Sequence, residues 1–325
     1  LRLSRRVDGG MALTLLLLAL VLPTFASSEY VLLGASIVVS ALVAASFNLL
    51  YGYTAMFSFG QAVFYGLGAY ATVLLVNEAG LSFFPALLAG ALVALAVAAI
   101  TGLLLVRLES IAFIMLTFAL AALLEFVAEH SPRLTSGDSG VIADLPDSLN
   151  PVLHVDLSYY AILAVAVAVL AGLYAFLRSP AGLLLRAIRE DPLRARTLGL
   201  AVERRRLAAF VLAGAIAAFG GGLSVLSAQI VYPDVFDWRI SAAALIATLL
   251  GGPGRFSGPL LGALLLGLID FYVAKLTTDT LLVEGLVLMA VILLAPRGLM
   301  GLRPHHRLGR RPPALAPGAA GSPDS

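Results

Sequence analysis

The side chains that usually carry catalysis or hold metal ions are few in this chain and are scattered along it. Charged residues make up 12% of the 325 residues, and cysteine is absent. Disulfides, thiolate metal sites and a catalytic cysteine are therefore excluded. The four histidines stand in polar segments, His130 and His154 beside one loop and His305 and His306 near the C-terminus. We expect no metal site, no cofactor bound by this chain and no enzymatic activity.

A glycine-rich stretch, GGPGRFSG at 251–258, imitates a phosphate-binding loop. A nucleotide loop of the Walker type needs a lysine followed by serine or threonine, which bind phosphate and Mg²⁺. Lysine occurs once, as Lys275, and a leucine follows it. The chain is therefore not expected to hydrolyse ATP, so any work that it drives must take energy from a partner ATPase or from an ion gradient.

Arginines are concentrated in residues 178–206, where the sequence contains eight of them. A platform for single-stranded nucleic acid would interleave aromatic residues with these cations, and none are present here, so we expect no nucleic-acid partner. Two short amphipathic helices are predicted, with Leu185 and Ile188 close together on one side of the first. One interpretation of this segment is that its arginines simply contact lipid headgroups.

A capping pattern in the same segment favours a docking element for a soluble partner instead. Asp191 and Pro192 have the types found at an N-cap and at the first helical position, and Gly199 is typical of a helix end. The residues between them would form a helix of about two turns. The candidate docking residues are Arg186, Arg189, Asp191, Pro192, Leu193, Arg194, Arg196, Leu198 and Gly199.

Polar side chains also interrupt an apolar stretch between residues 47 and 70. Asn48, Ser58, Gln61 and Tyr65 lie there. In hydrocarbon an amide must find partners or line a wet cavity. We interpret these four residues as candidates for the wall of a solute pathway or for a broken helix beside a site. Bonding only to neighbouring helices is the alternative.

Membrane-spanning helices must position these groups. Hydrophobic residues make up 60% of the chain, the mean hydropathy is +0.99, and several uncharged runs exceed the roughly 18 residues that cross a bilayer. The predicted fold is an all-α, polytopic integral membrane helical bundle. Its ten transmembrane helices are predicted at about 11–26, 30–50, 54–76, 83–105, 110–128, 157–177, 207–229, 238–251, 257–275 and 280–295.

The distribution of basic residues orients this bundle. Cytoplasmic loops are enriched in Lys and Arg, and arginines gather at the N-terminus, in 178–206 and after 296. Loop 129–156 has five acids and one arginine. Ten crossings then place both termini in the cytoplasm and 129–156 outside. Cleavage of a signal peptide after Ser28 is the alternative to a retained first helix.

Residues 1–303 are expected to form a single transmembrane domain. Residues 304–325 are rich in Pro and Gly and are expected to form a disordered cytoplasmic tail. Small residues four apart in 214–222 and 258–267 predict close helix contacts, either inside one subunit or between two subunits.

Five segments, in order, resemble permease subunits of branched-chain amino-acid ABC importers of the LivM type. The segments are FNLLYGYTAMFSFGQAVFYGLGAYATVLL (47–75), IAFIMLTFAL (111–120), LTSGDSGV (134–141), GLLLRAIREDPLRARTLGL (182–200) and LIATLLGGPGRFSGPLLGALLLGLI (245–269). Together they span residues 47 to 269.

This resemblance implies a permease subunit of the bacterial inner membrane. It implies cytoplasmic ATPase subunits that carry ATP and Mg²⁺, a second related permease subunit and a periplasmic solute-binding protein. Residues 178–206 would be the cytoplasmic coupling segment, and 129–156 the longest contact for the binding protein.

The resemblance leaves the solute open. The family often has Gly-Gln at the positions of Ala55 and Met56, and often His at the position of Gln61. Branched-chain or related amino acids, urea and amides are all compatible with these differences. A gradient-driven secondary transporter or channel for a small polar solute is the alternative function.

Overall fold

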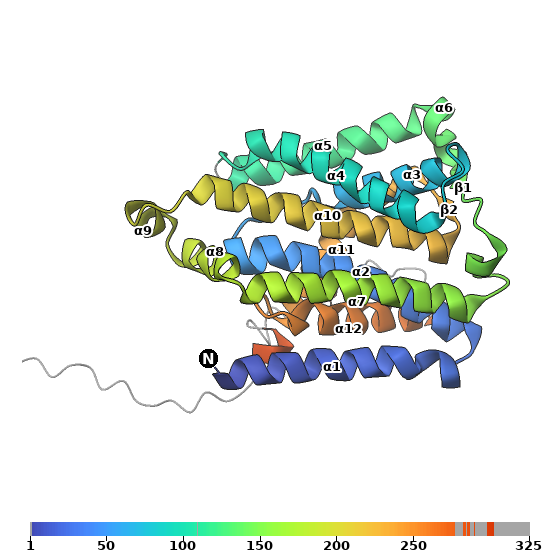
Figure 1. Cartoon of the computed structure of the whole chain (residues 1–325), viewed down its shortest axis with the longest axis horizontal. Coiled ribbons are helices and arrows are strands. Elements are labelled where there is room, and N and C mark those ends of the chain that lie inside the picture. The colour runs from blue at the N-terminus through green and yellow to red at the C-terminus, as the bar shows by residue number, and fades with distance from the viewer. Residues whose placement is uncertain are drawn as a thin grey trace, which may run out of the picture.

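The computed structural model describes residues 2–108, 110–276, 282–283, 285–286, 289 and 298–301. Most of these residues form long helices that lie side by side and alternate in direction (Figure 1). The long helices are α1 (Arg2–Phe25), α2 (Ser28–Thr54), α3 (Gln61–Asn77), α4 (Phe83–Leu105), α5 (Ser110–Glu129), α7 (Val155–Arg178), α10 (Val202–Ala228), α11 (Trp238–Gly251) and α12 (Ser257–Leu276).

Short elements connect them. Those in the connections are α6 (Pro132–Thr135), η1 (Gly137–Ser139), η2 (Asp147–Leu149), α8 (Pro180–Glu190), α9 (Pro192–Thr197), η3 (Pro233–Phe236) and η4 (Leu299–Gly301). Strand β1 (Val141–Ile142) pairs antiparallel with β2 (Ile230–Val231), and Val141 lies opposite Val231. This small sheet ties the loop between α5 and α7 to the end of α10.

Seven of the described helices are long and apolar enough to cross a membrane, and α3 and α11 are shorter apolar helices of 17 and 14 residues. These nine correspond to the first nine predicted crossings, which confirms a polytopic helical membrane protein. The predicted tail at 304–325 lies outside the described residues, as does most of the predicted crossing at 280–295.

Helix α10 occupies the centre of the bundle and α1 its periphery. In the 18-residue apolar stretch of α10, 78% of the residues are buried, whereas none are buried in the corresponding stretch of α1. Close contacts around α10 depend on small residues, because a Cβ added to Gly221 would collide with the carbonyl oxygen of Tyr65 in α3. Similarly, a Cβ on Gly262 of α12 would collide with the carbonyl of Ala247 in α11. The glycine-rich patterns therefore serve packing inside this subunit.

The third predicted crossing, at 54–76, is wrong at its beginning. Helix α2 continues to Thr54, residues 55–60 are not helical, and α3 begins at Gln61. Ala55 adopts a left-handed conformation with φ 56° and ψ 25°, which ends α2. The hydroxyl of Ser58 then accepts a hydrogen bond from the Gly60 N–H at 3.0 Å, which stabilises a turn instead of a continuous helix.

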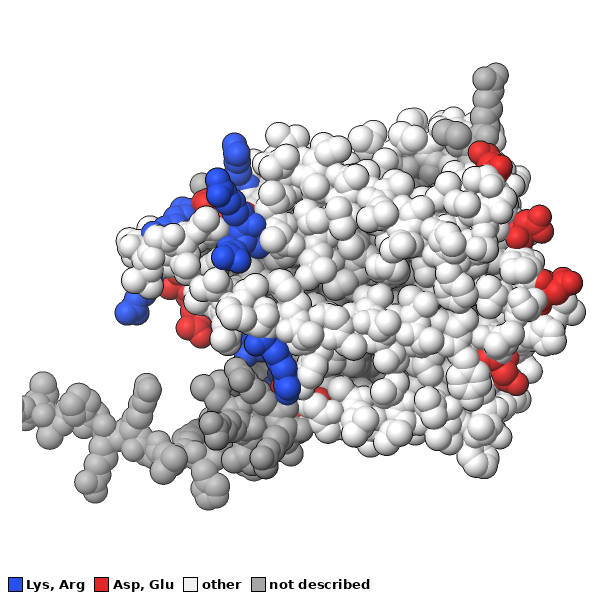
Figure 2. All heavy atoms as spheres, viewed as in Figure 1, with Lys and Arg blue, Asp and Glu red and all other residues white. Residues whose placement is uncertain are grey.

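Charges separate toward the two ends of the bundle. In the face shown in Figure 2, Lys and Arg gather at one end and Asp and Glu dominate the other. We call the first the basic end; it includes α8, α9, the end of α2 and the connection 252–256. The acidic end includes 78–82 and the loop 130–154. The two loops expected on opposite sides of the membrane, 178–206 and 129–156, thus lie at opposite ends.

Candidate functional site

The non-helical segment 55–60 enters the bundle, and side chains from other helices satisfy its backbone. The Phe59 N–H donates to the Thr117 hydroxyl of α5 at 3.2 Å, and the Ser241 hydroxyl of α11 donates to the Phe59 carbonyl at 2.6 Å. Ser241 also accepts from the Ala62 N–H at 2.9 Å. Irregular backbone at membrane depth is tolerated where protein groups satisfy it in this way.

Two helices therefore begin inside the bundle, and their first turns meet. The contact between Ala62 and Ser241 joins the N-terminal turns of α3 and α11. Helix α3 runs to the acidic end, where Asn77 donates to the Ile142 carbonyl at 2.7 Å. Helix α11 runs to the basic end and stops at Gly251. N-terminal turns carry partial positive charge, and broken helices in transporters present such turns to solutes and ions.

Gln61, the first residue of α3, lies at this meeting point. Its side chain is fully buried, and its Oε1 is 2.8 Å from the Ser46 hydroxyl of α2. Its Nε2 has no hydrogen-bond partner among the described residues. An unsatisfied buried amide group costs about 1–3 kcal/mol, so this position suits a site whose ligand supplies the missing partner. Gln61 and Ser58 have no exposed surface, so the meeting point is closed to solvent in this structure.

The other predicted pathway residues make bonds within the chain. Asn48 donates through Nδ2 to the Arg255 carbonyl and accepts at Oδ1 from the Gly254 N–H, both at 2.9 Å. It therefore ties α2 to the connection between α11 and α12. Tyr65 bonds to Ser224 of α10 through its hydroxyl. Of the four candidates, Gln61 and Ser58 lie at the broken helix, and Asn48 and Tyr65 tie neighbouring elements together.

Sequence reasoning missed Ser46, Thr117 and Ser241, which hold the broken segment. Serine and threonine in apolar helices are weak sequence signals of such a contact. Their hydroxyls also bond to carbonyls of their own helix, as Thr117 does to Ile114 at 2.9 Å. The position of Ser241 in the first turn of an unusually short apolar run was the available signal.

Aromatic rings flank the broken segment. Successive ring contacts at 5.4 to 6.3 Å join α2, the segment 55–60, α5 and the start of α11. The rings belong to Phe47, Phe57, Phe59, Phe118 and Trp238. Phe118 and Trp238 are exposed on the outside of the described bundle. The meeting point of α3 and α11 therefore lies beside a surface that another protein could cover.

The second predicted site, the segment 178–206, forms the predicted capped helix. Asp191 accepts from the Arg194 N–H at 2.9 Å, Pro192 is the first residue of α9, and Gly199 has a positive φ of 81°. Leu185 and Ile188 are buried, and Ile188 packs with Ala195 and Val202. This packing fixes α8 and α9 to each other and to the start of α10.

The arginines of α8 face the bundle. The guanidinium carbon of Arg186 lies 4.9 Å from the centroid of the Tyr53 ring in α2. Arg189 donates through Nη1 to the Gly52 carbonyl at 2.5 Å. Gly52 precedes the break at residue 55 by three positions, so α8 is bonded to the end of α2 that leads into the broken segment.

Helix α9 presents side chains away from the bundle. Leu193 is 71% exposed and Leu198 is 74% exposed. Arg194 is exposed as well, and Arg196 forms a 2.5 Å ion pair with Glu203 at the surface. Large apolar side chains that are exposed together and rimmed by polar residues mark a candidate protein-interaction surface. The predicted docking residues thus divide into an inward set on α8 and an outward set on and after α9.

A family model described as branched-chain amino acid transport system / permease component matches residues 10–296. The "High-affinity branched-chain amino acid transport system permease protein LivM" of Escherichia coli is 26% identical over 321 residues, which cover 90% of this chain and 75% of the relative. The similarly described BraD of Pseudomonas aeruginosa is 26% identical over 80% of this chain and 91% of the relative. The "Autoinducer 2 import system permease protein LsrC" of Klebsiella pneumoniae is 34% identical over 51% of each chain. No solved structure matches the chain significantly.

Proposed function

This chain belongs to the branched-chain amino acid transport system / permease component family, and we propose that it imports branched-chain or related amino acids as the membrane subunit of an ATP-driven complex. The E. coli and P. aeruginosa relatives, described as branched-chain amino acid permeases, support this solute class. A relative described as a permease of an autoinducer 2 import system supports a wider range of solutes for chains of this kind. Urea and short amides therefore remain within the proposal.

The energy comes from a partner ATPase. The sequence contains no Walker lysine, whereas α9 presents exposed Leu193 and Leu198 on a capped helix at the basic end. These exposed leucines are the observation that carries the proposal. They would enter a groove on cytoplasmic ATPase subunits, which hold the ATP and Mg²⁺.

Movement of the ATPase subunits reaches the broken helix through α8. Arg189 bonds to the Gly52 carbonyl, and the break follows Gly52 within three residues. A shift of α8 and α9 therefore moves the end of α2 together with segment 55–60. The meeting point of α3 and α11 then opens alternately toward the two sides, as one bistable element that the ATPase biases.

Gln61 and the first turns of α3 and α11 would contact the polar part of the solute. The buried Nε2 of Gln61 lacks a hydrogen-bond partner in the described part of the chain, and helix N-termini favour a carboxylate. A second, related permease subunit would cover the exposed aromatic surface at Phe118 and Trp238. The translocation pathway would then run between the two subunits.

The charge distribution supports an orientation. The basic end, with the ATPase-docking helix α9, faces the cytoplasm of a bacterial inner membrane, and both termini lie there. The acidic end faces outward, and loop 129–156 receives the periplasmic solute-binding protein. Strand β1 holds this loop against β2, so docking of the binding protein would act on the segment that leads into α11.

Co-purification tests the docking of the ATPase. We expect the double variant Leu193→Ser, Leu198→Ser to insert normally and to retain less than about a tenth of the ATPase that wild type retains. The matched control is Leu153→Ser, which replaces a leucine of 58% exposure at the acidic end. Full ATPase retention by the double variant would contradict docking through α9.

A further inference from the structure

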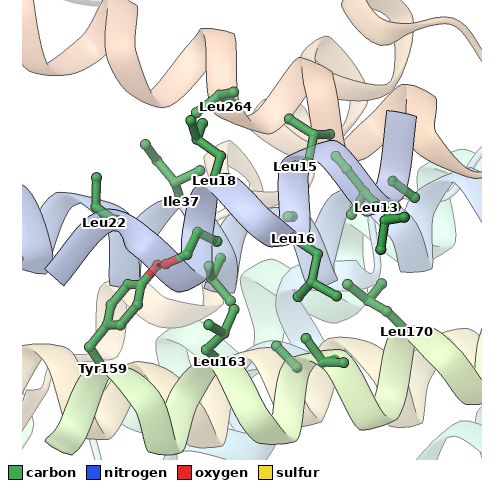
Figure 3. A pocket seen from close by; sticks show the side chains of 18 of the residues that line it. Leu13, Leu15, Leu16, Leu18, Leu22, Ile37, Tyr159, Leu163, Leu170 and Leu264 are labelled. Carbon is green, nitrogen blue, oxygen red and sulfur yellow. Dashed lines mark hydrogen bonds between the residues drawn. The ribbon is translucent and has the colours of Figure 1, made fainter. Parts of the chain in front are cut away.

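A cavity of about 530 Å³ lies between α1, α2, α7 and α12, away from the broken helix. Figure 3 shows Leu16 of α1 and Leu163 and Leu170 of α7 pointing into the space between these two helices. Among the described residues, the lining contains only aliphatic, phenylalanine, tyrosine and glycine side chains. The hydroxyl of Tyr159 in this wall donates to the Ala19 carbonyl at 2.8 Å. The cavity therefore suits an apolar ligand rather than a zwitterionic solute.

The cavity opens sideways along α1. Leu13 and Leu18 line it and are nevertheless 57% and 59% exposed. Its lining along α1 runs from Gly9 to Leu22, which corresponds to about 20 Å of helix at 1.5 Å per residue. Because α1 is a membrane-spanning helix on the periphery of the bundle, this opening faces lipid.

The lining and the opening indicate the occupant. The cavity extends along about 20 Å of α1, its lining is apolar, and its opening faces lipid. A single hydrocarbon chain is long, thin and apolar, and a bilayer supplies it in high concentration.

Cationic groups gather at one end of the cavity. The guanidinium carbon of Arg178 lies 4.2 Å from the centroid of Tyr174, a ring that lines the cavity. Arg255 directly precedes Phe256, which lines the same end.

One acidic group, Asp8, also lies at this rim. It bonds to Ser257 and interacts electrostatically with Arg255 and Arg186. Arg178 is exposed and provides the rim with a further cation. Basic pockets between membrane helices on the cytoplasmic side bind anionic lipid headgroups.

We propose that this cavity is a binding site for one anionic phospholipid, with an acyl chain between α1 and α7 and the headgroup phosphate on Arg178. The lipid fills the space that separates α1 from the bundle, and its phosphate sits where the cavity meets the basic end. The site is independent of the solute pathway, since none of its lining residues belongs to the broken helix.

Native mass spectrometry of the full-length chain tests the proposal. Phosphatidylglycerol and phosphatidylcholine with identical acyl chains are titrated in separate samples. We expect one tightly retained phosphatidylglycerol, and Arg178→Gln should lower its retention about fivefold while leaving phosphatidylcholine unchanged. Arg205→Gln removes another exposed arginine at the basic end of the bundle. This variant should retain the lipid as wild type does.

Filling the cavity provides the second arm. Ala12→Phe and Ala171→Phe place a ring in the cavity from opposite walls, and each should reduce retention of both lipids about tenfold. Ala96→Phe, on the exposed side of α4, is the matched control. Undiminished retention in either correctly inserted cavity variant, or in Arg178→Gln, would overturn the proposal, and so would retention of a free fatty acid in place of phospholipid.

Discussion

Two buried amides in neighbouring segments have different environments. Asn48 uses both ends of its amide, on the Arg255 carbonyl and the Gly254 N–H. Gln61 bonds to Ser46 through Oε1 and leaves Nε2 without a partner in the described part of the chain. An unpaired buried amide group does not stabilise the folded chain. We therefore assign solute contact to Gln61.

Replacement of each amide by leucine separates these roles. Gln61→Leu should lower uptake by about tenfold or more, since a solute hydrogen bond is lost, while the melting temperature of the detergent-solubilised chain stays near wild type. Asn48→Leu should cost about 1–3 kcal/mol of stability, because it leaves two half-buried backbone groups, the Arg255 carbonyl and the Gly254 N–H, unpaired. Uptake assays and thermal unfolding of both variants check this. Wild-type uptake by Gln61→Leu would remove Gln61 from the pathway.

The sequence alone identifies the capping residues of α9 but not the hydroxyls that hold the broken segment. Asp191, Pro192 and Gly199 were assignable because capping depends on residues only a few positions apart. The partners of Phe59 and Ala62 were not, because Thr117 and Ser241 lie 58 and 179 positions from them. Only the fold brings these hydroxyls to the break.

At the scale of elements, α8 and α9 pack into one unit that has an outward surface and a surface facing α2. Leu193 and Leu198 face outward, whereas Arg189 faces α2. Docking and transmission should therefore be separable by mutation.

Arg189→Met should retain the ATPase and lose most uptake. The variant keeps the outward leucines but removes the bond to the Gly52 carbonyl, and we expect uptake to fall about tenfold or more. Measurements of ATPase co-purification and of uptake on the same preparation check this. Arg204→Met, an exposed arginine of the same segment, should behave as wild type. Equal uptake by Arg189→Met and Arg204→Met would show that α8 does not transmit movement through this bond.

Close helix packing gives a further prediction for α10. Gly221→Ala should destabilise the chain by about 1–3 kcal/mol, because the new Cβ collides with the Tyr65 carbonyl of α3. Gly172→Ala places the same methyl group where no atom lies within 4 Å, and it should not destabilise. Thermal unfolding in detergent distinguishes them, and equal melting temperatures would contradict the packing of α3 on α10.

The positions of the helices followed from hydropathy, but the break did not. An uncharged run through 54–76 satisfies the rule for one spanning helix, and hydropathy does not register a left-handed Ala55. Ser58 and Gln61 were the visible signs that this run is unusual, and they indicated a site without locating the helix start.

At the scale of the whole molecule, the separation of charge predicts the orientation in the membrane. The chain has no cysteine, so single cysteines can be introduced without removing others. Leu198→Cys at the basic end should react with a membrane-impermeant maleimide only from the cytoplasmic side. Leu153→Cys at the acidic end should react only from outside. The reverse pattern in intact and inverted vesicles would contradict the proposed orientation.

The central claim is that this chain moves solute only when a separate ATPase is docked on α9. Uptake into proteoliposomes, with the cognate binding protein supplied, tests it most directly. The complete complex should accumulate solute against its gradient with ATP and should be insensitive to a protonophore, and the chain without the ATPase should accumulate none. Uphill accumulation by the chain alone, abolished by the protonophore, would contradict the claim.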